Sequence, residues 1–187
     1  MPIKKYIWPI ATIGLILTAT VFELRRQGRM WVCTCPQIFV TGDAWSSRTS
    51  QLFLDPYSLT HVAHGMVLAG LLVLLLGRVA PVWRLTIAVA IESLWEIIEN
   101  SNAVIDRYRE ATAALGYQGD TIVNSLGDIM SCALGFILAR RLGWRRSIVL
   151  FVAIEIILVF WIRDSLLLEI IMLIHPVGAI KTWQMGH

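Results

Sequence analysis

The sequence predicts an all-α protein, a polytopic membrane helix bundle with about five transmembrane helices. Of its 187 residues, 57% are hydrophobic and only 16% are charged, whereas soluble domains contain about 25% charged residues. Several apolar runs are long enough to cross the roughly 30 Å hydrocarbon core of a bilayer as helices. Most of the eight tryptophans stand near the ends of these runs, where interfacial aromatic residues gather. We expect residues 1–187 to form a single transmembrane domain.

Five apolar segments account for the expected transmembrane helices. The first follows Lys4 and Lys5, and we interpret it as an uncleaved span because no small-x-small cleavage site follows it. Asp55 and Pro56 mark a turn before the second span, and Pro81 lies in the short turn before the third. The expected spans cover residues 7–24, 58–77, 82–100, 120–139 and 147–162.

Two further segments have helical character. The polar connector at residues 101–119 is expected to include a short helix of its own. The apolar segment at residues 165–175 is short for a span. It fits an interfacial helix, a re-entrant segment or the end of a long tilted span, and the sequence leaves these interpretations open.

The basic residues predict the orientation of the bundle in a bacterial inner membrane. Cytoplasmic loops carry an excess of lysine and arginine in such proteins. With the N-terminus in the cytoplasm, that side receives Lys4, Lys5, Arg78, Arg84 and the four arginines of RRLGWRR at 140–146. We therefore expect a multi-pass protein of the inner membrane with a cytoplasmic N-terminus.

Acidic and amide side chains form two rows inside these spans. The three glutamates of the third span share one helix face, because steps of four and three residues return to about the same side. A second row of two aspartates and one asparagine begins the fourth span. Ionisable groups within membrane segments are expensive and usually functional. The candidate catalytic residues are Glu92, Glu96, Glu99, Asp120, Asn124 and Asp128.

The antiparallel order of the spans predicts that these rows meet. The start of the second span, the end of the third, the start of the fourth and the end of the fifth lie on one membrane face. At ~1.5 Å per residue, His64 and Asp128 reach similar depths, and His61 lies nearer the surface. The sequence therefore predicts a polar pocket in the outer half of the bilayer, open toward the outside.

Two histidines suggest a metal in this pocket. His61 and His64 are three residues apart and share a helix face, and imidazoles beside carboxylates form workable metal sites. The candidate metal ligands are His61, His64 and Glu96, and the cofactor would be a divalent ion, with Zn, Mn, Fe and Mg not distinguished. Two alternatives remain open. The histidines would only hydrogen-bond the glutamates between helices, or the carboxyl groups would serve general acid–base catalysis or a proton relay.

Arginines near the expected mouth are candidates for substrate binding. Arg107 and Arg109 follow the third span, and Arg163 ends the fifth. Guanidinium groups bind phosphate and carboxylate in a bidentate manner, so these residues are expected to contact a headgroup. The alternative interpretation is that they are solvated loop charges.

Small residues on the fourth span and one acid on the fifth have simpler interpretations. Gly127, Ser131 and Gly135 form a stripe that is typical of close helix packing. Glu155 lies toward the middle of the fifth span, and the sequence assigns it no role.

The order of these motifs resembles that of VanZ-like integral membrane proteins. That family shows E-x-x-Q, an arginine in the following loop and a D-x-x-x-N-x-x-G helix. Here Glu96 begins the first motif, Arg107 follows, and Asp120, Asn124 and Gly127 form the last. The match covers roughly residues 58–139. Glutamate replaces the glutamine at position 99, and Asp128 is an additional acid.

The whole chain, including RDSLLLEIIMLIHP near its end, also resembles an uncharacterised family of small proteobacterial inner-membrane proteins. The two resemblances imply a helical membrane fold and a polar pocket. The VanZ-like proteins are associated with the cell envelope and with glycopeptide resistance. This association implies an envelope lipid or a lipid-linked precursor as the partner.

Three functions fit these observations. The first is an intramembrane hydrolase or transferase, metal-dependent in one version, that acts on an envelope lipid or a lipid-linked headgroup. The second is a protein that binds or transports a lipid or small ligand without chemistry, although five spans without an inverted repeat argue against a secondary transporter. The third is a structural membrane subunit. Membrane lipid is the expected partner, and nucleic acid is not expected because the basic residues lie in short connecting segments.

Overall fold

The computed structural model describes residues 4–35, 39–114 and 116–186, and within them the chain is helical, as the sequence predicts. The short helix predicted within residues 101–119 is present as α4 (Asn102–Ala111). The helices of the described residues are α1 (Lys4–Arg26), α2 (Ser58–Leu75), α3 (Pro81–Glu99), α4 (Asn102–Ala111), α5 (Ile122–Leu142), α6 (Trp144–Ile162), α7 (Leu166–Ile174) and α8 (Gly178–Met185).

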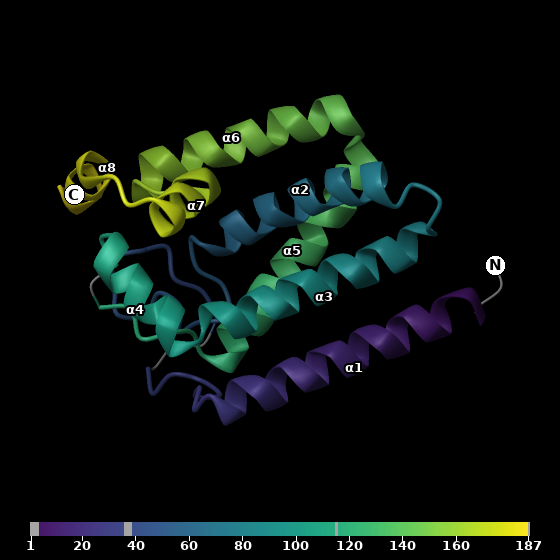
Figure 1. The fold of residues 1–187 in the computed structure, drawn as a ribbon, viewed down its shortest axis with the longest axis horizontal. Helices are drawn as coiled ribbons and strands as arrows, with labels where there is room; N and C mark the ends of the chain where they lie inside the picture. The colour runs from purple at the N-terminus through teal and green to yellow at the C-terminus, as the bar shows by residue number, and fades with distance from the viewer. Residues whose placement is uncertain (1–3, 36–38, 115, 187) are drawn as a thin grey trace.

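The long helices α1, α2, α3, α5 and α6 alternate in direction, and α4, α7 and α8 lie at the end away from the N-terminus (Figure 1). Among the described residues, three helices are long and apolar enough to cross a membrane, namely α1, α2 and α5. Helix α3 carries one arginine and three glutamates, and α6 carries two arginines and one glutamate. These charges set α3 and α6 apart from ordinary spans, so the number of five spans stays a prediction.

Polar side chains define the starts of the helices that frame the pocket end. Oδ1 of Asp55 accepts hydrogen bonds from the backbone N–H groups of Tyr57 (2.8 Å) and Ser58 (3.2 Å). The predicted turn at Asp55 and Pro56 is therefore confirmed. Thr121 accepts from the N–H of Asn124 at the start of α5. Such contacts satisfy N–H groups that the first helical turn leaves without partners.

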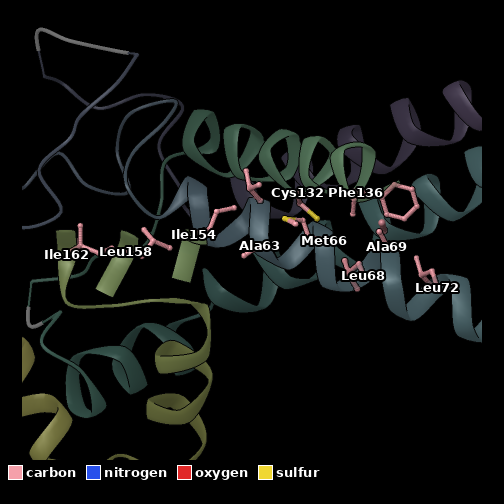
Figure 2. Packing of buried hydrophobic residues seen from close by; sticks show 13 residues of the cluster. Ala63, Met66, Leu68, Ala69, Leu72, Cys132, Phe136, Ile154, Leu158 and Ile162 are labelled. Carbon is pink, nitrogen blue, oxygen red and sulfur yellow. The ribbon is translucent and has the colours of Figure 1, made fainter. Parts of the chain in front are cut away.

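The apolar core lies between α2, α5 and α6 (Figure 2). Phe136 of α5, Leu72 of α2 and Leu158 of α6 are almost fully buried in it. Cys132 is also buried there as a free thiol. The remaining cysteines, Cys33 and Cys35, are joined by a disulfide in the connector before α2.

Glycines allow α2 and α5 to approach each other closely. A Cβ atom placed on Gly65 would overlap the carbonyl group of Cys132, and one on Gly135 would overlap that of Val62. The predicted packing role of Gly135 is thus confirmed. Gly127 packs instead against the carbonyl of Phe53 in the connector. These contacts fix the distance between the two helices that carry His61, His64 and Asp128.

Replacement of Gly135 by alanine should destabilise the bundle, because the added methyl group meets backbone that cannot rotate away. We expect a loss of about 1–3 kcal/mol, the usual cost of overpacking. The measurement is thermal unfolding of the purified protein in detergent. Gly70→Ala is the matched control, since a Cβ at that position of α2 meets nothing within 4 Å. Equal melting temperatures for the two variants would contradict the assignment of close packing.

Candidate functional site

A cavity of about 980 Å³ lies at the polar end of the bundle. Its walls come from the connector before α2, the start of α2, the end of α3, α4, the start of α5 and α7. Of the candidate residues predicted from sequence, those that line it are His61, His64, Glu99, Asp120 and Asp128. The structure thus brings polar groups from separate long helices to one hollow.

Glu92 is the acid that contacts both histidines. Nδ1 of His61 lies 2.5 Å from Oε1 of Glu92, and Nδ1 of His64 lies 2.6 Å from Oε2. Glu92 is fully buried, and the His64 side chain is 26% exposed. One carboxylate of α3 is therefore held between two imidazoles from successive turns of α2. His61 also reaches α5, since its Nε2 lies 3.9 Å from Oδ2 of Asp128.

Glu96 lies deeper and has a different environment from the one expected. Its nearest histidine atom among the ion pairs of the described residues is Nδ1 of His61, at 3.6 Å. Glu96 is fully buried, and neither carboxylate oxygen has a hydrogen-bond partner. A buried carboxylate without a partner is costly, so this side chain needs a proton, a cation or a ligand beside it.

Two groups of side chains within the described residues have the spacing to hold a metal ion. His61, His64 and Glu92 place one ligand atom each within 4.8 Å of one another, and so do His61, Glu96 and Glu99. Imidazole and carboxylate are common ligands of divalent transition metals. The group that includes both predicted histidines therefore contains Glu92 and not the predicted Glu96.

The three residues of the second polar row, Asp120, Asn124 and Asp128, have different surroundings in the structure. Asp128 accepts a hydrogen bond from the Ser58 hydroxyl at 2.8 Å and stays in the cavity wall. Asn124 does not join the cavity. Its side-chain amide donates to the carbonyl of Leu52 at 2.7 Å, and the residue is buried between α5 and the connector. This contact anchors the connector and does not orient a ligand.

Asp120 is held by a residue that the sequence interpretation omitted. Nδ2 of Asn100 donates to Oδ2 of Asp120 at 2.8 Å, and the backbone N–H of Asp120 donates to Oδ1 of Asn100 at 2.7 Å. Tyr117 adds a third contact to Asp120. The paired bonds tie the end of α3 to the start of α5. The only signal in the sequence was an asparagine directly after a helix.

The three arginines predicted to bind substrate contact backbone carbonyls and do not line the cavity. Arg107 donates through Nε and Nη2 to the carbonyl of Leu173, at 3.0 and 2.9 Å. Arg109 donates to the carbonyl of Tyr117, and Arg163 to that of Trp183. Their positions favour a structural role, because they satisfy carbonyl groups of α7, α8 and the loop after α4.

Glu155 receives a role from the structure. Its two carboxylate oxygens accept hydrogen bonds from the N–H groups of Leu166 and Leu167, at 3.2 and 3.3 Å. An acid at a helix N-terminus pairs with N–H groups that have no helical partner and interacts favourably with the helix dipole. Glu155 of α6 thereby fixes the start of α7.

Further acids and tyrosines of the cavity wall were not among the predicted site residues. Asp164 is 9% exposed, and burial raises the pKa of its carboxyl to about 7. Burial likewise raises the pKa of Glu169 well above its ordinary value, and the nearby Asp164 and Glu99 add to this effect. Tyr108 and Tyr117 meet edge to face, with ring centroids 5.4 Å apart. The two tyrosines and the two acids come from separate parts of the sequence and share no motif, so the sequence did not mark them.

Comparison with known proteins places the chain in a family. Residues 24–186 match the family model described as "Protein of unknown function (DUF2585)". The chain belongs to this family. A UPF0314 protein of Paracoccus denitrificans is 40% identical over 171 residues, which are 91% of this chain and 89% of that protein. No solved structure matches the chain.

Other relatives of the DUF2585 protein cover nearly its whole length. A UPF0314 protein of Sinorhizobium fredii is 40% identical over 184 residues, 98% of this chain and 93% of the relative. One of Sphingopyxis alaskensis is 39% identical over 180 residues, 96% of this chain and 95% of the relative. The expected membership in an uncharacterised proteobacterial family is confirmed. The resemblance to VanZ-like proteins stays a prediction from motifs.

The raised pKa of Asp164 predicts that stability falls as pH rises from about 4 to about 7. In this range the folded state keeps a proton that the unfolded chain releases, so the free energy of unfolding decreases, by up to about 1.4 kcal/mol per pH unit. Tyr57, Glu155 and Glu169 also face Asp164. Asp164→Asn should flatten this slope in denaturation curves measured at several pH values. Asp106→Asn, on the exposed face of α4, is the control, and an unchanged slope in Asp164→Asn would contradict the prediction.

Proposed function

We propose that this DUF2585 protein is a metal-dependent hydrolase or transferase of the bacterial inner membrane that acts on an envelope lipid or a lipid-linked headgroup. The observation that carries the proposal is the position of Glu92, fully buried between His61 and His64 beside a cavity of about 980 Å³. Small-molecule sites commonly have volumes of roughly 300–1,000 Å³. A cluster that only locked helices together would not require such a hollow.

The proposed orientation in the membrane rests on the ends of the long helices. The turn between α2 and α3 carries Arg78, and α5 ends and α6 begins with four arginines. Both turns lie at the end opposite α4 and α7 (Figure 1). Basic turns favour the cytoplasmic side. In this arrangement five helices cross the membrane, the N-terminus is cytoplasmic, and the cavity faces the outside.

The proposed metal ligands are His61, His64 and Glu92. A bound divalent ion would compensate the buried carboxylate, and it would supply an activated water or polarise a phosphoryl oxygen. His64 is the ligand with the greatest side-chain exposure of the three, and it lines the cavity. Metal and substrate would therefore meet at His64.

The remaining acids have proposed roles in proton transfer. Asp128 and Glu99 line the cavity, and Glu96 lies behind Glu99 and His61. A general acid or base must lie within hydrogen-bond reach of the reacting group, directly or through one water. Asp128 and Glu99 satisfy the requirement of access, whereas buried Glu96 would act through His61 or Glu99. A protein that binds the same lipid without chemistry is the second candidate, because the cavity alone supports it equally.

The metal proposal predicts stoichiometric binding that depends on His64. Purified protein in detergent should retain zinc or another divalent ion after loading and desalting, as measured by elemental analysis. His64→Ala should weaken binding at least about 100-fold, since even loss of an outer-shell contact costs 10–100-fold. His175→Ala is the matched control, because His175 is exposed at the end of α7. Absence of metal from the loaded wild-type protein would contradict the proposal that this protein is a metalloenzyme.

The enzymatic proposal predicts an altered lipid composition in a strain that lacks the gene. One envelope lipid or lipid-linked precursor should accumulate relative to the parent strain in a mass-spectrometric comparison. The wild-type gene and Glu110→Gln, a variant on the exposed face of α4, should restore the parental pattern. Glu96→Gln should fail to restore it although the protein reaches wild-type levels in the membrane.

His64→Ala provides a second variant for this experiment if the Glu96→Gln protein does not reach wild-type levels in the membrane. An unchanged lipid composition in the deletion strain would favour the non-catalytic binding protein. Full complementation by both variants would exclude the cluster of His64 and Glu96 as the functional site.

A further inference from the structure

The cavity is acidic to a degree that the proposed reaction does not require. Its lining includes six carboxylic acids among the described residues, against one arginine (Arg48), two histidines (His61 and His64) and no lysine. These acids are Asp55, Glu99, Asp120, Asp128, Asp164 and Glu169. The arginines expected to bind a phosphate do not line the cavity, and they contact backbone carbonyls instead. A positively charged group in the cavity would favour the ionised form of these acids and pair with them.

Some of these acids already have hydrogen-bond donors, and others have few. Asp55 is bound to three backbone N–H groups, and Asp120 to Asn100 and Tyr117. The ion pairs of the described residues include none that involves Glu99, Asp164 or Glu169. Asp164 and Glu99 lie close enough to Glu169 for their charges to raise the pKa of its carboxyl. Asp164 accepts hydrogen bonds from the Ser165 N–H and the Tyr57 hydroxyl, but none of the three acids has a cationic partner among the described residues. These three acids of α3, α7 and the turn before α7 form an acidic wall.

The buried Glu96 points to a ligand beside this wall. Both of its oxygens are buried without a hydrogen-bond partner, and one lies within 4.8 Å of ligand atoms of Glu99 and His61, which line the cavity. Since a buried carboxylate without hydrogen bonds is costly, a cation at Glu99 would also compensate Glu96. This observation is independent of the charge of the cavity wall.

Aromatic side chains form another part of the cavity lining near the acids. Tyr57, Tyr108, Tyr117, Trp45 and Trp95 also line the cavity. Aromatic rings attract ammonium groups through the negative potential of their faces, and aromatic cages with acids are a known way to bind alkylated ammonium ions. A metal ion gains little from such rings. The combination favours an organic ammonium group over a second metal ion.

We infer that the wall formed by Glu99, Asp164 and Glu169, together with the surrounding tyrosines and tryptophans, binds the ammonium group of the substrate. This inference rests on the proposed function, because it assigns a substrate class to the same cavity. The ligand is then a lipid headgroup that carries an amine or a quaternary ammonium, such as ethanolamine or choline joined through a phosphodiester. The ammonium lies at the acidic wall, and the polar linkage of the headgroup lies nearer His64.

Binding to defined lipids tests this inference. The full-length protein is reconstituted in nanodiscs that contain either phosphatidylethanolamine or phosphatidylglycerol as a minor component in an inert lipid. These lipids share the phosphodiester and differ in the ammonium group. We expect a preference of at least about tenfold for phosphatidylethanolamine in native mass spectrometry, and Glu169→Gln should remove it. Glu110→Gln should keep it, since Glu110 lies outside the cavity lining.

Additional arms separate the possible outcomes. Choline and ethanolamine are titrated as free amines with tryptophan fluorescence as the readout. If they bind with Glu169-dependence and the lipids show no preference, the ammonium site stands and its ligand is a free amine. Equal binding of both lipids and no response to free amines would overturn the inference. Glu99→Gln serves as a second variant if Glu169→Gln does not fold.

The test remains informative if the protein contains no metal. The preference for ammonium should persist in His64→Ala, because His64 is not part of the acidic wall. Retained preference without bound metal would remove the metalloenzyme proposal and keep the ammonium site. Bound metal with neither a lipid preference nor a response to free amines would remove the ammonium site and keep the metalloenzyme proposal.

Discussion

The contact between Glu92 and two histidines is the interaction on which the polar half of the molecule depends. A carboxylate fully buried among membrane-type helices costs several kcal/mol unless hydrogen bonds or opposite charges compensate it. His61 and His64 provide this compensation from one face of α2. Removing one partner from a buried ion pair usually costs about 3–5 kcal/mol. The contact therefore sets the rotation of α2 relative to α3, and with it the position of the cavity.

Helix α2 is constrained on its other side by close packing. Gly65 of α2 meets the carbonyl of Cys132, and Gly135 of α5 meets the carbonyl of Val62. The same helix is thus fixed to α5 by close backbone packing at the glycines and to α3 by polar contacts. The helix has little freedom to rotate, because a rotation that relieved one contact would break the other. A rigid α2 keeps His61 and His64 at a constant position in the cavity wall.

Many polar residues near the cavity hold the connector and the short helices in place. Only a smaller set of polar residues is therefore available for chemistry. Asn124 binds the connector, Glu155 begins α7, and Arg107 binds the end of α7. Each satisfies backbone groups that would otherwise lack partners in an apolar environment. Glu96 has no hydrogen-bond partner, and Glu99, Asp164 and Glu169 line the cavity without a cationic partner among the described residues. This division separates positioning residues from those available to a ligand.

The sequence by itself determined the helical class, the approximate limits of the long helices and the end of the bundle where polar groups gather. Apolar runs and helix spacing are local properties, and short turns force neighbouring helices to be antiparallel. Only the tertiary structure decided that Glu92 contacts both histidines, that Asn124 and the three arginines contact backbone carbonyls, and that Asp164 and Glu169 face the cavity. Those contacts depend on how each helix is rotated about its axis and on which distant backbone groups lack hydrogen-bond partners. The spacing of residues within one segment determines neither of these.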